Sequence, residues 1–407
     1  MPRTNRQLRV VGLSAALIFG CQRSPAAAHP AVPRTHLTPS PATRPADGSA
    51  EPQPDDPGVA RAHCPPDENH VDAAGRAYDA HQYDLALACA EDALLEDPES
   101  AEAEQQRSLA LAALGKIDDA RLAIQHALAL DPDDPETLAD AADLYLTHGG
   151  VTRELDEIAL EYARRGERRA RRHHPELLDQ LDLLQGMALN DLGRFEEALE
   201  KLDQTLARDP QDLDARYEHA VALFELCRFA PAKADLKQML GELPDDAYAH
   251  HELGLTLERL GDAKQAQVEL ARSTALDPEA FPAELPVKMD EFKEMVSAAV
   301  RALPPQLRHD LNEVKLSSEE MPDLSDLTVD APPLSPTILG LFRGAPLDDQ
   351  SGLGVQEPRA ILLYRRNLVR VARDRAELAK QIQITLWHEL GHLRGADDDE
   401  LRLRGLE

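Results

Sequence analysis

Two histidines and a glutamate near the end of this 407-residue sequence have residue types and a spacing that could bind a metal and move a proton. The stretch TLWHELGHLRGADDDEL, residues 385–401, contains His388 and His392, four positions apart, with Glu389 beside the first. Because a helix turns by about 100° per residue, side chains four apart lie on one face. Two imidazoles on one face can bind a single zinc ion, and Glu389 is then placed to act as a general base on water.

A third ligand is expected shortly after this helix. Gly395 allows the helix to end in a left-handed turn, after which the chain can fold back toward the histidines. Asp397, Asp398 and Asp399 follow, and the spacing of ten residues from His388 favours Asp398. Two His and one Asp leave a fourth position open, as a catalytic zinc site requires. The alternative is a terminal amphipathic helix with ordinary surface or packed histidines.

The elements that must position these residues follow Pro278. We predict an amphipathic helix over residues 286–303 and a last helix that starts near Asp374. Between them lie three short β-like runs separated by Pro, Ser and Asp. These runs are NEVKLSSEE (312–320), PTILGLFRG (336–344) and PRAILLYRRNL (358–368). The order of helix, three strands and helix predicts a small α+β domain over residues 281–407.

This segment resembles the minimal zincin-like metalloproteases, small bacterial domains related to the metzincins. The resemblance runs from about Met289 to Glu407, through ILGLFRGAPL (338–347), AILLYRRNL (360–368) and ITLWHELGHLRGADDDEL (384–401). It implies that His388, His392 and Asp398 are metal ligands and that Glu389 is the general base. It also implies that a strand, either ILGLFRG or AILLYRR, pairs with an extended substrate. Two features differ from the metzincins proper: Asp398 stands where they have a third His, and no Met-containing turn follows it.

A period of 34 residues organises the middle of the chain. It separates Pro98 from Pro132, and also successive members of the series Pro210, Pro244 and Pro278. Each unit contains two apolar-striped helices, a pattern that resembles the tetratricopeptide repeat. Pro132 and Pro210 are 78 residues apart, two periods plus ten, so one unit carries an insertion that includes the Arg-rich stretch 162–176. We predict about six units over residues 67–280, and hence a multidomain chain in which an all-α solenoid precedes the α+β domain.

The partners that we expect follow from the repeats and from the charge. One repeat cannot bury its own apolar face, so the units must stack into a curved solenoid. Its concave surface is expected to bind a peptide or protein, the alternative being a spacer or scaffold. The formal net charge of −30 argues against nucleic acid and against docking to anionic lipid by charge alone. For the basic stretch from Arg164 to Arg172, a solvated helix face is favoured over contact with an acidic partner.

The first residues predict export. Arg3, Arg6 and Arg9 precede an apolar run over residues 10–19, which is typical of a signal peptide over residues 1–20. The following LIFGC resembles a bacterial lipobox, which implies that Cys21 becomes a lipidated N-terminus. We therefore expect a protein anchored to the bacterial membrane, periplasm-facing or on the outer membrane, with plain secretion as the alternative. Residues 21–66, rich in Pro, Ala and Thr, predict a disordered tether.

The remaining cysteines and paired histidines predict no further site. Cys64, Cys89 and Cys227 are odd in number and far apart in the sequence, so no disulfide framework is expected. We predict that Cys89 and Cys227 are small buried residues. The pairs at 173–174 and 250–251 lack an acidic motif, so these histidines are expected to face solvent.

Two functions follow from these patterns. The first is a lipid-anchored zinc metallopeptidase whose repeats recruit a protein partner or substrate. The second is a scaffold lipoprotein whose zincin-like domain binds metal without turnover. The presence of Glu389 favours the enzyme, because that residue serves hydrolysis rather than metal binding.

Overall fold

The computed structural model describes residues 63–65, 69–148, 152–347, 358–403 and 405. The signal over residues 1–20, Cys21 and nearly all of the tether over residues 21–66 lie outside these residues. The described chain forms two compact units, one ending at Ala188 and the other starting at Leu189. None of the described helices has the length and apolar character needed to span a bilayer.

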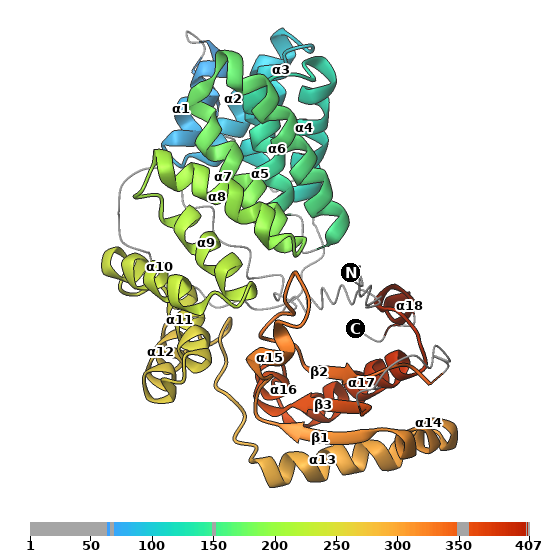
Figure 1. Ribbon diagram of the computed structural model, residues 1–407. Helices are drawn as coiled ribbons and strands as arrows, with labels where there is room; N and C mark the ends of the chain where they lie inside the picture. Colours follow the sequence, from blue (N-terminus) through green and yellow to red (C-terminus); the bar gives the residue numbers. More distant parts are fainter. Residues whose placement is uncertain (1–62, 66–68, 149–151, 348–357, 404, 406–407) are drawn as a thin grey trace, which may run out of the picture. The chain divides into compact units, whose positions relative to one another are not determined.

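The repeat region is all-helical, as predicted, and contains helices α1 to α12 (Figure 1). Their bounds are α1 His70–Asp79, α2 Tyr83–Glu96, α3 Ala101–Ala113, α4 Ile117–Leu130, α5 Pro135–His148, α6 Arg153–His173, α7 Leu178–Asp191, α8 Phe195–Arg208, α9 Leu213–Glu225, α10 Phe229–Glu242, α11 Ala247–Arg259 and α12 Ala263–Leu276, with a short 3₁₀ helix, Pro175–Leu177, before α7.

Small side chains recur at the places where the helices approach each other. A fully or almost fully buried alanine occupies the same position in successive repeats, at Ala86, Ala120, Ala198, Ala232 and Ala266. The turn within a repeat recurs as well. Its backbone is left-handed at His81, Gly115, Gly193, Cys227 and Gly261, with φ between 56° and 81°. Glycine adopts this conformation at low cost, which explains its frequency there.

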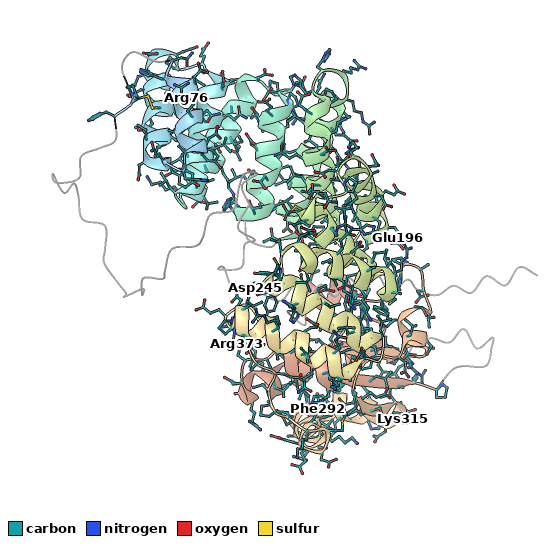
Figure 2. All side chains as sticks on the ribbon, turned by 90° about the vertical axis from the view of Figure 1, so that its left-hand side faces the viewer. Arg76, Glu196, Asp245, Phe292, Lys315 and Arg373 are labelled. Carbon is teal, nitrogen blue, oxygen red and sulfur yellow. A yellow bond between two sulfur atoms is a disulfide. The ribbon has the colours of Figure 1, made fainter. Side chains whose placement is uncertain are left out.

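A disulfide joins Cys64 to Cys89, although the odd number and wide spacing of the cysteines predicted no disulfide framework. Figure 2 draws the bond in yellow. Cys89 is buried on α2, and the segment that carries Cys64 lies against α1 and α2. The sequence separation of 25 residues spans a complete helix and its turn, so the proximity arises from the packing of the two helices.

The inserted residues lengthen a helix. The Arg-rich stretch forms the second half of α6, which has 21 residues. Its guanidinium groups pair with carboxylates of the same unit: Arg168 with Glu161 at 3.2 Å, and Arg169 with Asp133. This agrees with a solvated basic helix face.

The pair His250 and His251 does not face solvent, contrary to the prediction. Both side chains are half-buried. His250 Nδ1 lies 2.7 Å from Glu269 Oε2, and the ring of His251 stacks on Phe281 with centroids 4.4 Å apart. A neighbouring repeat helix and the segment that follows the repeats cover these rings.

The α+β domain contains the predicted helices and strands together with short helices that were not predicted. Its elements are α13 Met289–Ala302, α14 Pro305–Asp310, a 3₁₀ helix Leu311–Glu313, β1 Lys315–Glu319, α15 Leu324–Leu327, β2 Gly340–Arg343, β3 Ala360–Tyr364, α16 Arg365–Arg370, α17 Arg375–Leu393 and α18 Asp398–Leu403. The predicted strand at 358–368 is therefore too long. It ends at Tyr364, and α16 follows directly.

The sheet has the order β1-β3-β2. The central strand β3 pairs in parallel with β1 and antiparallel with β2. On one face, Ile361 and Leu363 of β3 belong to a core with Phe292 of α13 and Leu386 of α17. The long helix α17 therefore rests on the sheet.

A second apolar cluster covers the other face of the sheet. It contains Leu341 and Tyr364 from the strands and Leu334 and Ile338 from the segment before β2. Because successive strand residues point to opposite faces, both sides of this small sheet are packed.

Candidate metal centre

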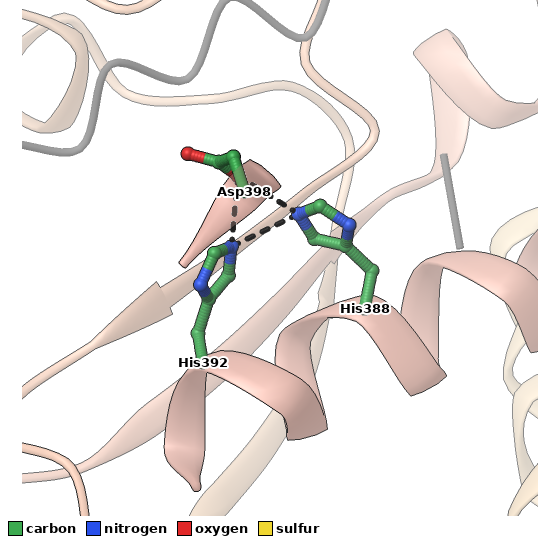
Figure 3. A group of neighbouring side chains, drawn as sticks. All are labelled: His388, His392 and Asp398. Atoms are coloured by element: carbon green, nitrogen blue, oxygen red, sulfur yellow. Dashed lines mark hydrogen bonds and ion pairs between the residues drawn. The ribbon is translucent and has the colours of Figure 1, made fainter. Parts of the chain in front are cut away.

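Helix α17 presents His388 and His392 on one buried face. Asp374 caps the start of the helix, since its Oδ1 accepts hydrogen bonds from the backbone nitrogens of Ala376 at 2.8 Å and Glu377 at 2.9 Å. The two imidazoles are 4% and 8% exposed, and their Nε2 atoms lie 2.9 Å apart (Figure 3). Since apolar side chains of α17 occupy the core, the packing of the helix fixes the direction of the histidines.

The end of α17 turns the chain back toward them. Gly395 has φ 85°, the left-handed conformation expected of a glycine at this position. The backbone nitrogens of Gly395 and Ala396 donate to the carbonyls of His392 and Gly391, at 2.9 and 3.0 Å. Helix α18 begins two residues later.

The neighbouring aspartates have different roles in this turn. Asp397 is exposed, and its Oδ1 accepts a hydrogen bond from the backbone nitrogen of Glu400 at 2.9 Å, which caps α18. Asp398 faces the histidines, with Oδ1 at 3.4 Å from His388 Nε2 and 3.3 Å from His392 Nε2. The side chain of Asp399 lies outside the described residues. The aspartate that the spacing favours is therefore the one brought to the histidines.

The three donor atoms fit a metal ion. His388, His392 and Asp398 form a group that could hold one. Their donor atoms are separated by 2.9 to 3.4 Å. Ligands at about 2.1 Å from a tetrahedral zinc ion lie about 3.4 Å from one another. Two imidazoles and one carboxylate at this separation match such a site with its fourth position open.

Hydrogen bonding prepares one of the imidazoles for this role. His392 Nδ1 lies 3.0 Å from the carbonyl oxygen of Ala396. When Nδ1 carries the hydrogen and donates to this carbonyl, the lone pair of Nε2 points to the site. Burial opposes charge on His392, but its hydrogen bond with Asp398 and the charge of Glu389 raise its pKa. Burial also opposes charge on Asp398, yet hydrogen bonds from both histidines hold its pKa well below the usual range.

Glu389 lies beside these residues against strand β2. It is 2% exposed, and the backbone nitrogen of Phe342 donates a hydrogen bond to its carboxylate. Burial raises its pKa, although the nearby histidines act in the opposite direction. Gly340 makes this approach possible, because a Cβ there would lie 2.8 Å from Glu389 Oε1.

The strand next to the site has a free edge. Both edges of β3 are used, since it pairs with β1 and β2. Among the residues that the structure describes, β2 pairs only with β3. Of the two runs that the resemblance left open, only ILGLFRG contains a strand with an edge that no other described strand uses, and on that edge the Phe342 nitrogen donates to Glu389.

Three residues that were not predicted support these side chains: Gly340 and Phe342 lie against Glu389, and the Ala396 carbonyl lies against His392. Each acts through its backbone or through the lack of a side chain, so its residue type carries little signal. Gly340, a glycine inside a strand pattern, is the exception, because such a glycine often marks a close approach by another group.

Comparisons with known families agree with this arrangement. Residues 311–406 match the family described as Zincin-like metallopeptidase. Two families of tetratricopeptide repeat match residues 71–135 and 189–234. The chain thus contains tetratricopeptide repeats followed by a zincin-like metallopeptidase domain.

Several solved structures resemble about half of this chain. PilW, described as a widely conserved type IV pilus biogenesis factor, is 22% identical with a TM-score of 0.45, over 52% of this chain and 93% of PilW. PilF of Pseudomonas aeruginosa is 14% identical with a TM-score of 0.44, over 56% of this chain and 96% of PilF. YrrB, described as a TPR protein with an unusual peptide-binding site, is 18% identical with a TM-score of 0.37, over 47% of this chain and 93% of YrrB. A search of the curated proteins found no match.

Proposed function

We propose that this chain, in which tetratricopeptide repeats precede a zincin-like metallopeptidase domain, is a zinc-dependent peptidase. In this proposal His388, His392 and Asp398 hold the zinc ion, and Glu389 is the general base. The observation that carries it is the convergence of the three donor atoms within 2.9 to 3.4 Å, beside the buried carboxylate of Glu389. A structural role for zinc would not require that carboxylate.

The reaction would divide the work among these groups. Zinc, when bound, acts as a Lewis acid that polarises the scissile carbonyl and makes water acidic enough to attack near neutral pH. Glu389 takes the proton of the attacking water and returns it to the leaving amine. A raised pKa suits a carboxylate that must both accept and release a proton. The hydrogen bond from Phe342 holds the carboxylate in place during both steps.

The free edge of β2 is the proposed site for an extended substrate. A peptide that adds to a sheet edge is held by main-chain hydrogen bonds, which do not depend on its sequence. Arg343 ends this strand, and Phe342 both belongs to it and donates to Glu389. A peptide on this edge would therefore lie next to the general base.

We further propose that the protein is exported, lipidated at Cys21 and held at the bacterial membrane, with the repeats recruiting a protein partner or substrate. The basis for export is the pattern of the first 21 residues. The disulfide between Cys64 and Cys89 supports it, because such bonds persist in oxidising compartments outside the cytoplasm.

The test is the metal content and peptidase activity of the chain from residue 22, beside its His388→Ala and Glu389→Gln variants. We expect close to one zinc per chain in the parent and in Glu389→Gln, and much less in His388→Ala. Cleavage of an unstructured protein such as casein should be present in the parent alone. Removal of Glu389 should cost at least about a hundredfold in kcat, as general bases commonly do.

The control for folding is His173→Ala, which changes an exposed histidine of the repeats. It should keep both zinc and activity. Absence of stoichiometric zinc in the parent would contradict the proposal. Zinc without any cleavage would instead favour a metal-binding scaffold.

A further inference from the structure

The last repeats and the α+β domain belong to the same compact unit and are joined by a buried ion cluster. Glu258 of α11 has a side chain that is only 4% exposed. Its Oε1 accepts from Arg366, and its Oε2 accepts from Arg370 at 2.6 Å. Both arginines lie on α16. One carboxylate of the repeats thus holds two turns of a helix in the catalytic domain.

This cluster is sensitive to the loss of its negative charge. Charge-assisted hydrogen bonds to carboxylate are among the stronger ones in proteins. Removal of one partner from a buried pair is costly, because it leaves the other charge without compensation. Arg370, with 16% of its side chain exposed, pairs with Glu258 on α11. Arg366 also pairs with Glu320 of its own domain at 3.7 Å, so Glu258 matters most for Arg370 at the end of α16.

A second contact lies at the turn between α9 and α10. Cys227 occupies the left-handed turn position, with φ 56°, where Gly193 and Gly261 stand in neighbouring repeats. A side chain in this conformation is disfavoured relative to glycine. The thiol packs beside the cluster on the second face of the sheet, and Sγ lies 3.9 Å from the carbonyl oxygen of Leu334. Glu225, at the end of α9, accepts a hydrogen bond from Ser335.

Helix α16 is connected in turn to strand β2. Asn367 is 5% exposed, and its amide nitrogen donates to the carbonyls of Pro336 at 3.1 Å and Ile338 at 2.7 Å. These carbonyls precede Leu339, whose own carbonyl accepts from the backbone nitrogen of Tyr364 at 2.9 Å. The segment that leads into β2 is therefore fixed by α16 on one side and by the repeats on the other.

The first residue of β2 is the one that touches the general base. A Cβ on Gly340 would lie 2.8 Å from Glu389 Oε1, so a small movement of β2 changes the space around that carboxylate. Phe342, two residues on, supplies the hydrogen bond to Glu389. A continuous series of contacts thus leads from Glu258 through Asn367 of α16 and strand β2 to Glu389.

We propose that the last repeats are a positioning part of the catalytic centre. Glu258 is a positioning residue that fixes α16, and Asn367 on α16 fixes β2 against Glu389. The repeats then do more than recruit a partner, since the geometry of the base depends on them. The catalytic consequence rests on the proposed peptidase function, whereas the structural dependence of β2 on Glu258 does not.

The structural test is hydrogen exchange of backbone amides, measured by mass spectrometry on the whole chain from residue 22. Glu258→Gln removes the charge and keeps the size of the side chain. We expect exchange over residues 336–343 to become at least about tenfold faster, while exchange over α1–α4 stays at the parent rate. Alkylation of Cys227 should also become faster, because residue 334 no longer shields it.

The matched control is Glu269→Gln. Glu269 is similarly buried, at 13% exposure, and pairs with His250 inside the repeats. It should leave exchange over residues 336–343 unchanged. If Glu258→Gln destabilises the whole unit, Arg370→Gln removes only one of the two pairs and should give the same local pattern. Parent-like exchange over residues 336–343 in both Glu258→Gln and Arg370→Gln would overturn the proposal.

The catalytic test uses the same variants. Glu258→Gln should lower kcat at least about tenfold while KM changes by less than about threefold and zinc per chain is unchanged, because Glu389 acts in the chemical step. Faster exchange in β2 with a parent-like kcat would overturn the catalytic part. A parent without any peptidase activity would contradict the proposed function, and the exchange measurements would still decide the positioning role of Glu258.

Discussion

At the scale of single residues, two carboxylates of the metal centre differ in the sign of their pKa shift. Hydrogen bonds from the two histidines outweigh burial and hold the pKa of Asp398 low. Burial dominates at Glu389 and raises its pKa. Opposed shifts of neighbouring acids commonly separate a permanently ionised group from one that exchanges a proton. These opposite shifts agree with the proposed roles, Asp398 as an ionised ligand and Glu389 as the group that exchanges a proton.

The close approach of Gly340 to Glu389 predicts that an added methyl group at position 340 lowers activity and stability. In Gly340→Ala the added Cβ would lie 2.7 Å from Thr385 Cγ2 and 2.8 Å from Glu389 Oε1. Since neither contact is tolerated, the side chains of Thr385 and Glu389, or β2 itself, must shift, at a cost of about 1–3 kcal/mol in stability. We expect peptidase activity to fall at least about tenfold with zinc still bound. Thermal unfolding, zinc content and initial rates measure these effects.

Gly241→Ala is the control for this substitution. A Cβ at Gly241, near the end of α10, meets no atom within 4 Å. It should leave zinc content and activity at the parent level and leave stability unchanged or slightly increased, because alanine favours helix. Gly340→Ala with parent-like activity would show that β2 does not restrict Glu389.

At the scale of elements, the disulfide fastens the first helix pair. The bond between Cys64 and Cys89 closes a loop of 25 residues around α1. A loop of this length contributes roughly 3 kcal/mol by restricting the unfolded chain. We expect the double variant Cys64→Ala, Cys89→Ala to expose α1 and α2 to much faster amide exchange, with α17 unaffected. Equal protection of α1 and α2 in both chains would contradict a stabilising role.

A buried carboxyl group on helix α5 predicts that the free energy of unfolding of the N-terminal unit depends on pH. Burial raises the pKa of Asp140 from 3.8 to about 7, despite a hydrogen bond from Gln105. Because the pKa is higher in the folded unit, the folded unit binds this proton more tightly than the unfolded chain does. The free energy of unfolding therefore falls as pH rises between these two values. Asp140→Asn should remove part of this slope and stabilise the unit at pH 8 by on the order of 1 kcal/mol, with little effect near pH 4.

Calorimetric unfolding at several pH values measures this slope. The control is Asp118→Asn, because the carboxylate of Asp118 is fully exposed. Its profile should match that of the parent. An unchanged slope in Asp140→Asn would show that other groups cause the pH dependence.

In the molecule as a whole, the zincin-like domain packs against the last repeats within the C-terminal unit. The short junction at residues 277–279 predicts such packing, and Glu258 and Cys227 supply it within the C-terminal unit. Residues 281–407 alone would lose Glu258, which is the partner of Arg370 and one of the two carboxylate partners of Arg366. We expect their thermal midpoint to lie several degrees below that of residues 189–407, since about 1 kcal/mol shifts the midpoint of a domain of this size by about 4 °C. Equal midpoints would contradict this dependence.

Local patterns in the sequence predicted most of the elements. The period of 34 residues predicted the repeats, because each small residue and turn serves the same local contact in every unit. Short β-like runs separated by Pro, Ser and Asp predicted three strands, and the last helix was predicted to start near Asp374, the residue that caps α17. The predicted third strand extended too far, because the residues RRNLVR form α16. Asn367 of this helix bonds to carbonyls about 30 residues away, a contact that no local pattern shows.

In the candidate site, too, some features could be predicted from local patterns in the sequence and others could not. His388, Glu389, His392 and the favoured Asp398 could be predicted from local patterns, because one helix and one turn set their spacing. The strand beside Glu389, the pairing of Cys64 with Cys89 and the contact of Glu258 with α16 could not be predicted in this way. Those contacts join segments distant along the chain, and only the packing of helices and sheet against a common core brings them together.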